Sequence, residues 1–137
     1  MESLTNNPLI PVMPNFPASY QRGTQRIALP YLNRTVMISV DDITCLEGEG
    51  NYTFLYTRDR KKYLISKTLK EFERTLDGNV FLRVHKSHIV NLGYVRRGVL
   101  GADRMLRMAD GREVAVSRRR LKEIWDRLNE YYQNLLN

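Results

Sequence analysis

Residues 81–92, FLRVHKSHIVNL, place two short apolar runs on either side of a polar segment, His85-Lys86-Ser87-His88, with Asn91 near the end. Short runs of branched and aromatic residues separated by a few polar ones predict two strands joined by a turn. The polar segment poses the functional question, because these side chains suit metal binding, acid/base chemistry or recognition of a partner. Which of these three functions applies depends on the charge and the motifs of the rest of the chain.

The same alternation of apolar runs and turn signals continues through most of the chain. A helix is predicted over 66–78, capped by Ser66 or Thr68, and a longer helix follows Ser117. Many short strands with few helices predict a mainly β, antiparallel domain. The strands are expected at 26–30, 35–40 after a turn at Asn33-Arg34, 43–49, 51–57, 63–66, 80–84, 88–92, and in a hairpin over 103–116 turned by Asp110-Gly111.

Residues 1–25 differ from the remainder, since they carry four of the five prolines and no sustained periodicity. We expect an extended or flexible N-terminal arm over 1–25 and one domain over 26–137. The single cysteine, Cys45, lies in an apolar run, which predicts a buried, inert thiol. With no apolar run long enough to span a bilayer, we expect a cytoplasmic protein without membrane contact.

Positive charge is concentrated in one segment. Residues 81–120 contain ten basic and three acidic residues, a surplus of +7 that equals the net charge of the whole chain. Nine of those ten are arginines, whose planar fork bonds phosphates and base edges bidentately. The pattern favours binding to a polyanion, although a solvated, charge-rich surface would carry the same charge.

Metal binding and catalysis find little support. His85 and His88 are three residues apart, so on strands they point to opposite faces unless the turn brings them together. No cysteine or third histidine completes a zinc site, and Ser87 between the histidines lacks the motifs of a nucleophile. We therefore expect no metal site, no catalytic residues, no cofactor and no small-molecule substrate.

Recognition of a partner is the remaining possibility, and three segments carry side chains that suit it. The turn and its flanks supply Lys86, Ser87 and Asn91, although His85 alone is better explained as a core histidine. The second candidate is the loop Asn51-Tyr52-Thr53 after the Gly48/Gly50 turn, which the start of a β-hairpin explains almost as well. The third is the run Arg118-Arg119-Arg120 at the start of the last helix. Three cations there oppose the helix dipole, which favours a functional use.

Four segments match a known family in order and spacing: DDITCLEGEGNYTFLYT, LKEFERTL, FLRVHKSHIVNL and GREVAVSRRRLKEI. Over about residues 27–125 the chain resembles the LytTR DNA-binding domain family of bacterial transcription regulators. The resemblance implies an elongated, antiparallel β-sheet sandwich with short helices and a C-terminal helix. It further implies loops that enter successive DNA major grooves and read short direct repeats in promoters.

The resemblance also assigns DNA contacts. It implies contacts from Asn51, Tyr52 or Thr53, from Lys86 with Ser87 beside it, and from Arg118, with Arg119 on the DNA backbone. Two positions depart from the family pattern. Lys86 stands where arginine is common, so phosphate contact is favoured over bidentate base contact, and His88 stands where tyrosine or phenylalanine is common.

The expected function is a stand-alone transcriptional regulator, because 25 N-terminal residues cannot form the receiver domain that many family members carry. The continued apolar face of the last helix has two interpretations: it packs on the sheet of its own domain, or it forms a homodimer. A homodimer through this helix or through the N-terminal arm would suit direct repeats, because two linked copies bind a repeat more tightly than one copy. The alternative is an interaction module whose basic face binds an acidic protein or RNA. Of the three functions, enzymatic activity has the least support in the sequence.

Overall fold

The computed structural model describes residues 25–96 and 103–136 of the chain. The predicted N-terminal arm lies outside these residues, apart from Gln25. The chain divides into two compact units, residues 1–43 and 44–137, which are described separately. The predicted domain over 26–137 thus spans part of the first unit and all of the second.

The first unit contains a β-hairpin followed by one short helical turn. Strands β1 (Arg26–Tyr31) and β2 (Arg34–Ser39) pair antiparallel, and η3 (Val40–Asp42) follows. Tyr31 pairs with Arg34, so the turn residues are Leu32 and Asn33, one position earlier than predicted. Leu32 adopts the left-handed backbone conformation (φ 58°) that two-residue hairpin turns require.

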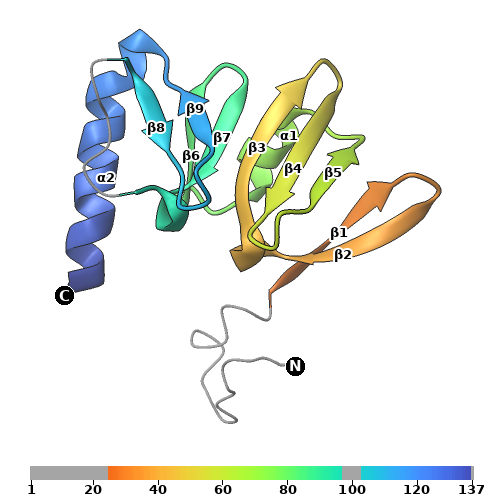
Figure 1. Ribbon diagram of the computed structural model, residues 1–137. Coiled ribbons are helices and arrows are strands. Elements are labelled where there is room, and N and C mark those ends of the chain that lie inside the picture. Colours follow the sequence, from red (N-terminus) through yellow and green to blue (C-terminus); the bar gives the residue numbers. More distant parts are fainter. Residues whose placement is uncertain (1–24, 97–102, 137) are drawn as a thin grey trace, which may run out of the picture. The chain divides into compact units, whose positions relative to one another are not determined.

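The second unit is built on a five-stranded sheet in the order β5-β4-β3-β7-β6 (Figure 1). The three consecutive strands β3, β4 and β5 are joined to the β6–β7 hairpin by pairing between β3 and β7, which run antiparallel. The opening stretch of the sequence therefore forms the β6–β7 hairpin, as predicted. The strands are β3 (Ile43–Glu49), β4 (Tyr52–Thr57), β5 (Lys62–Ile65), β6 (Phe81–His85) and β7 (His88–Asn91).

Helix α1 (Leu69–Thr75) connects β5 to β6. Of the two predicted caps, the structure selects Thr68: its Oγ1 accepts a hydrogen bond from Glu71 N at 3.2 Å, and Glu71 Oε1 accepts one from Thr68 N at 2.8 Å. This reciprocal capping box satisfies backbone donors that the helix itself leaves unpaired. Leu69 and Phe72 form the buried face of α1.

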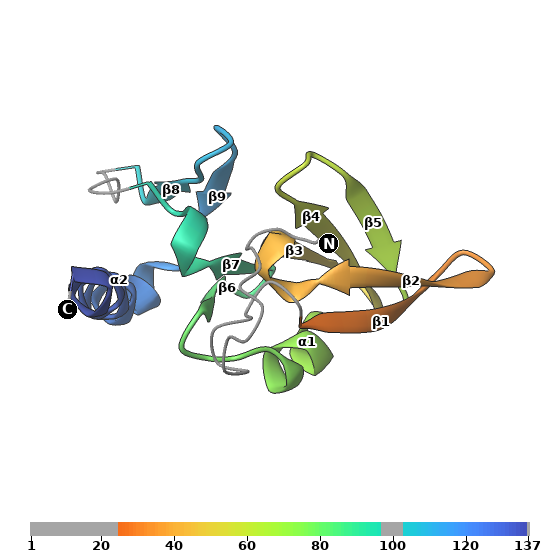
Figure 2. The same cartoon turned by 90° about the horizontal axis from the view of Figure 1, so that it is seen from below.

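The C-terminal part adds one more hairpin, β8–β9, and the long helix. It consists of η4 (Leu92–Tyr94), β8 (Met105–Arg107), β9 (Glu113–Ala115), η5 (Arg118–Arg120) and α2 (Leu121–Leu136). In both views α2 lies beyond the edge strand β6, away from β4 and β5 (Figure 1, Figure 2). Tyr132 Oη on α2 donates a hydrogen bond to Val95 O at 2.8 Å.

One hydrophobic cluster joins the sheet, the β8–β9 hairpin and α2. Its members include Val84 and Val90 from the sheet, Leu106 from β8 and Ile124 from α2, all fully buried. Cys45 belongs to the same cluster with 1% exposure, which confirms the predicted buried thiol. The architecture confirms a mainly β, antiparallel fold with short helices and a C-terminal helix. Among the described residues, no helix has the length and apolar character needed to cross a bilayer.

Candidate DNA interface

The topology of the sheet brings two turns to one edge. β7 runs antiparallel to β3, with His88 opposite Glu47, so the start of β7 lies beside the end of β3. The β6–β7 turn and the β3–β4 turn therefore lie at the same edge, because each turn directly adjoins one of these strand ends. Figure 1 shows both turns, and the segment leading into α2, at the upper ends of their strands.

Backbone hydrogen bonds fix the three segments to one another. Gly48 N near the end of β3 donates to Ser87 O in the β6–β7 turn at 2.8 Å. Ser117 N, immediately before η5, donates to Val84 O on β6 at 2.9 Å. The β6–β7 turn thus lies between the other two segments. We call the surface formed by Gly50-Asn51, Lys86-Ser87 and η5 the loop edge.

Arg83 holds the β6–β7 turn through its guanidinium group. Its Nε donates to His85 O at 3.0 Å and its Nη2 donates to Lys86 O at 2.6 Å. Its Nη1 donates to Glu73 Oε1 on α1 at 2.8 Å, which orients the guanidinium. Sequence reasoning counted Arg83 only as positive charge, since nothing in the pattern distinguished a structural arginine from an exposed one.

The loop edge carries three exposed cations. Lys86, Arg118 and Arg119 are exposed, and none has a carboxylate within ion-pair distance among the described residues. Several other cations of this unit do have a carboxylate partner, as in the pairs Arg83–Glu73, Arg107–Glu113, Lys122–Asp126 and Arg127–Glu130. The loop edge therefore presents uncompensated positive charge from two segments that sequence reasoning had singled out.

η5 places the arginine run at this edge. Arg118 and Arg119 point into solvent, whereas Arg120 is half-buried and its Nη1 lies 3.4 Å from Arg83 O. Ser117 occupies the cap position as predicted, but its side chain makes no capping hydrogen bond. The run therefore forms a separate short turn before α2.

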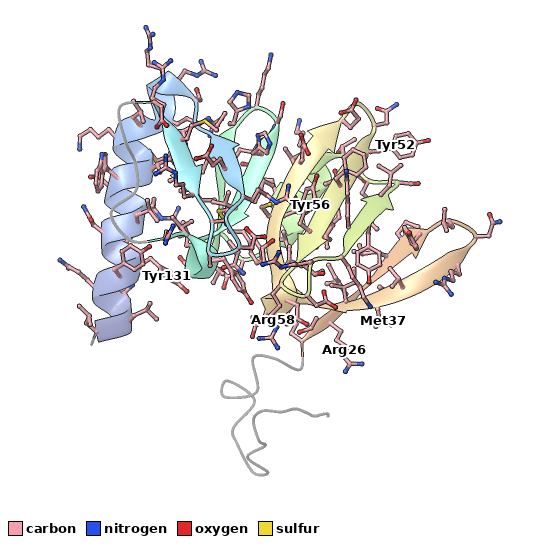
Figure 3. All side chains as sticks on the ribbon, viewed as in Figure 1. Arg26, Met37, Tyr52, Tyr56, Arg58 and Tyr131 are labelled. Carbon is pink, nitrogen blue, oxygen red and sulfur yellow. The ribbon has the colours of Figure 1, made fainter. Side chains whose placement is uncertain are left out.

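The β3–β4 turn exposes two of its three candidate residues. Asn51 is exposed, and Tyr52, labelled in Figure 3, is 47% exposed at the start of β4. Thr53 is buried instead, and its Oγ1 donates to Lys67 O at 2.7 Å. Because side chains alternate along a strand, Thr53 shares its inward face with the fully buried Leu55. That alternation is the sequence signal that could have placed it.

Asn91 is also buried, with 4% exposure. It ends β7, and its Oδ1 accepts a hydrogen bond from Gly93 N at 2.9 Å, which starts the short helix η4. Asparagine commonly bonds the backbone two residues on, so the following Leu-Gly-Tyr was a usable signal for this role. Asn91 lies at the opposite end of β7 from Lys86 and Ser87.

The β6–β7 turn brings the two histidines together, with ring centroids 5.6 Å apart. His85 Nδ1 accepts a hydrogen bond from Ser87 N at 3.1 Å, so this ring stabilises the turn. His88 Nε2 lies 3.8 Å from Glu47 Oε2, and burial lowers the pKa of His88 below its usual value. Within the described ranges, no three histidine, cysteine or acidic side chains are grouped as metal ligands.

Glu47 links His88 to the interior of the sheet. Tyr56 Oη on β4 donates to Glu47 Oε1 at 3.0 Å. Burial, with the Glu47 carboxylate as acceptor, raises the pKa of Tyr56 to about 12. The Tyr56, Glu47 and His88 side chains thus form a polar row behind the loop edge that the sequence did not reveal, because the three residues lie on different strands.

Comparison with known proteins identifies the domain. The family model of the LytTr DNA-binding domain matches residues 33–129. The chain is 33% identical over 109 residues to the transcriptional regulatory protein YpdB of Escherichia coli and 31% identical over 104 residues to the sensory transduction protein LytT of Bacillus subtilis, covering 77% and 74% of this chain. It is 44% identical over 62 residues, 45% of this chain, to the heme-containing CO-sensing transcriptional regulator RcoM 1 of Paraburkholderia xenovorans.

The chain spans less than half the length of these relatives: 44% of YpdB, 43% of LytT and 23% of RcoM 1. Among solved structures, a LytTr DNA-binding domain from Bacillus cereus superposes with a TM-score of 0.66 at 22% identity. That likeness covers 77% of this chain and 98% of the other, and it supports the same fold. The matched range agrees closely with the predicted 27–125, and the chain belongs to the LytTr DNA-binding domain family.

Proposed function

We propose that this DNA-binding domain serves a transcriptional regulator and reads short direct repeats in promoters with its loop edge. The observation that carries the proposal is a set of exposed cations, Lys86, Arg118 and Arg119, which have no ion-pair partner in the described part of the chain and lie on segments that hydrogen bonds hold together. Unpaired cations on a rigid edge attract phosphates without first breaking an internal ion pair. Turns that project from a sheet edge are narrow enough to enter a major groove.

The residues of the loop edge make different contacts with DNA in this proposal. Arg118 bonds a guanine edge bidentately, and Arg119 binds the DNA backbone. Lys86 acts as a point charge toward phosphate, with the Ser87 hydroxyl as a shorter-range hydrogen-bonding group. Asn51 presents an amide suited to adenine, and the hydroxyl of Tyr52 suits a phosphate.

Thr53 and Asn91 take supporting parts, in keeping with their burial. Thr53 ties the start of β4 to Lys67 O and so fixes the strand from which Tyr52 projects. Asn91 caps η4 at the other end of β7. Removing either side chain would affect DNA binding only through the stability or position of the strands.

Two copies of the domain on a direct repeat form the proposed binding unit. Helix α2 exposes Trp125 (43%), Leu135 (63%) and Leu136 (76%), which offers apolar surface for a second copy. Two linked copies bind a repeat far more tightly than one copy binds a half-site, because the second contact is intramolecular. The copies face the same way along a direct repeat, so the contact joins two different surfaces.

The test is selection of duplexes from a random pool by the purified protein, followed by titration of the recovered duplex at two salt concentrations. We expect enrichment of a direct repeat and a loss of about 1 to 3 kcal/mol of binding free energy with Arg118→Ala. Arg107→Ala is the matched control, because Arg107 on β8 is paired with Glu113 at 2.8 Å.

Each result has a defined meaning. An enriched repeat with loss confined to Arg118→Ala supports base-specific reading. An unenriched pool, bound only at low salt and equally by both variants, contradicts the proposal. It would favour the alternative of a generic basic face for an acidic protein or RNA.

A further inference from the structure

A hollow of about 410 Å³ lies near the end of the sheet opposite the loop edge. β4 begins at Tyr52 beside the loop edge and ends at Thr57 beside the hollow. Six extended residues separate these ends by about 17 Å, so one compact ligand cannot contact both. Figure 3 labels Tyr52, the first residue of this strand, and Arg58, which directly follows its last residue. The lining residues are Tyr56, Thr57, Arg60, Lys61, Asp110 and Arg112.

The hollow is positively charged. Three of its lining residues are cations, Arg60, Lys61 and Arg112, against the single carboxylate of Asp110. The Asp110 Oδ1 accepts a hydrogen bond from Arg112 N at 3.0 Å, so this carboxylate stabilises the β8–β9 turn. Lys61 has only the exposed Asp59 at 3.8 Å, and neither arginine has a carboxylate within ion-pair distance among the described residues.

Arg112 is held in place by an aromatic ring. Its guanidinium carbon lies 3.7 Å from the centre of the Tyr56 ring, a stacked cation–π arrangement. The ring is itself fixed, because Tyr56 is 7% exposed and its hydroxyl is bonded to Glu47. Stacking occupies one face of the guanidinium and leaves its N–H edge available for an anion.

Arg60 occupies a conformation that favours glycine. Its φ is 67°, in a turn closed by Arg60 N donating to Thr57 O at 2.9 Å and Thr57 N donating to Lys61 O at 3.0 Å. The left-handed region costs an arginine about 1 to 2 kcal/mol relative to the right-handed one. Arginine at this position therefore lowers the free energy of unfolding, but it places a positive charge at the hollow.

From these features we propose that the hollow binds a compact polyanion, a small molecule that carries phosphate or several carboxylates. The guanidinium of Arg112, held by the Tyr56 ring, donates hydrogen bonds to the anion. Arg60 and Lys61, in the β4–β5 turn, supply further positive charge. Phosphates and carboxylates share the requirement for charge-assisted N–H donors, which this site provides. The proposed ligand is distinct from the promoter DNA, because the site lies away from the loop edge.

The test is a nuclear magnetic resonance titration of the full chain, following the backbone amides. Pyrophosphate and citrate are the two probes, with sodium chloride added to hold ionic strength constant. We expect saturable shifts at Arg60, Lys61 and Arg112, with smaller shifts that do not saturate over the same concentrations at Lys86 and Arg118. A response to pyrophosphate alone assigns a phosphate ligand, and a response to citrate alone assigns a carboxylate ligand.

Two glycine substitutions separate binding from stability. Arg60→Gly should raise the free energy of unfolding by relieving the positive φ, yet weaken anion binding by about tenfold. Arg104→Gly is the matched control, because Arg104 also has a positive φ, 56°, but does not line the hollow. The proposal is overturned if shifts grow linearly without saturation, or if both variants bind the anion as tightly as the wild type.

Discussion

The two turns that meet at the loop edge are built in opposite ways. The β6–β7 turn is restrained by side chains: Arg83 bonds two of its carbonyls, and His85 accepts from Ser87 N. At the β3–β4 turn, nothing lies within 4 Å of a Cβ placed on Gly50, and no side chain among the described residues bonds to Gly50 or Asn51. The conformation of the β6–β7 turn therefore depends on hydrogen bonds from side chains, whereas that of the β3–β4 turn depends on its own backbone.

The largest effect is expected from Arg83→Ala, which removes the restraint on the β6–β7 turn. Two carbonyls and Glu73 lose a charged donor, so the free energy of unfolding should fall by about 2 kcal/mol. Affinity for the selected duplex should fall by about tenfold, because Lys86 is no longer held in position. Urea unfolding and DNA titration measure the two effects.

Two further variants sharpen this test. Arg83→Lys keeps the charge but cannot bond both carbonyls and Glu73 at once, so its DNA affinity should resemble that of Arg83→Ala. Arg74→Ala removes an exposed arginine of α1 and should change stability by no more than about 0.5 kcal/mol. If the Arg83 variants bind DNA as well as Arg74→Ala, the turn does not need the arginine.

A smaller effect is expected from Gly50→Ala in the β3–β4 turn. Gly50 has φ 63°, where an added Cβ costs about 1 kcal/mol even in open space. Gly78→Ala is the control, since Gly78 lacks a positive φ and also has nothing within 4 Å of the added carbon. Calorimetry should show a lower melting temperature for Gly50→Ala alone. Equal changes in both variants would mean that backbone conformation does not stabilise this turn.

The smallest effect concerns His88, at the base of the restrained turn. Burial lowers its pKa from 6.5, while the Glu47 carboxylate opposes that shift and His85 and Arg112 add to it. The unfolded chain is therefore protonated first, and stability present above about pH 6.5 is lost as the pH falls through the folded-state pKa. Urea unfolding between neutral pH and about pH 5 measures this loss.

The matched variant is His88→Phe, which removes the titrating group from β7. Its free energy of unfolding should fall less steeply over the acidic range than that of the wild type. Parallel slopes in the two proteins would show that His88 does not titrate differently in the folded and unfolded states. The β3–β4 turn has no comparable group and should not contribute to this difference.

Most of the fold was predictable because its signals are local. Alternation located the strands, and Thr68 with Glu71 forms the capping box that starts α1. Asp110-Gly111 turns the last hairpin as predicted, with Gly111 at φ 91°. The first hairpin turn was misplaced by one residue, because Asn33-Arg34 is the more typical turn pair and leucine rarely adopts a positive φ.

The candidate site was only partly predictable, because its geometry depends on contacts between strands. Lys86, Arg118 and Asn51 lie on exposed segments, as their positions after apolar runs indicated. The inward direction of Thr53 follows from alternation along the predicted strand 51–57, but Thr53 was also predicted to be a loop residue that contacts DNA. The parts played by Arg83 and Tyr56 could not be read from sequence, since their partners lie on other elements.

The burial of Cys45 has a consequence for chemical labelling. Desolvation raises the pKa of this thiol to about 11, so at neutral pH only about one molecule in ten thousand carries the reactive thiolate. A cysteine introduced at the exposed position of Asn51 would be free of this desolvation and would react far faster with maleimides. Fluorescent probes can therefore be attached to the β3–β4 turn while the native cysteine is left in place.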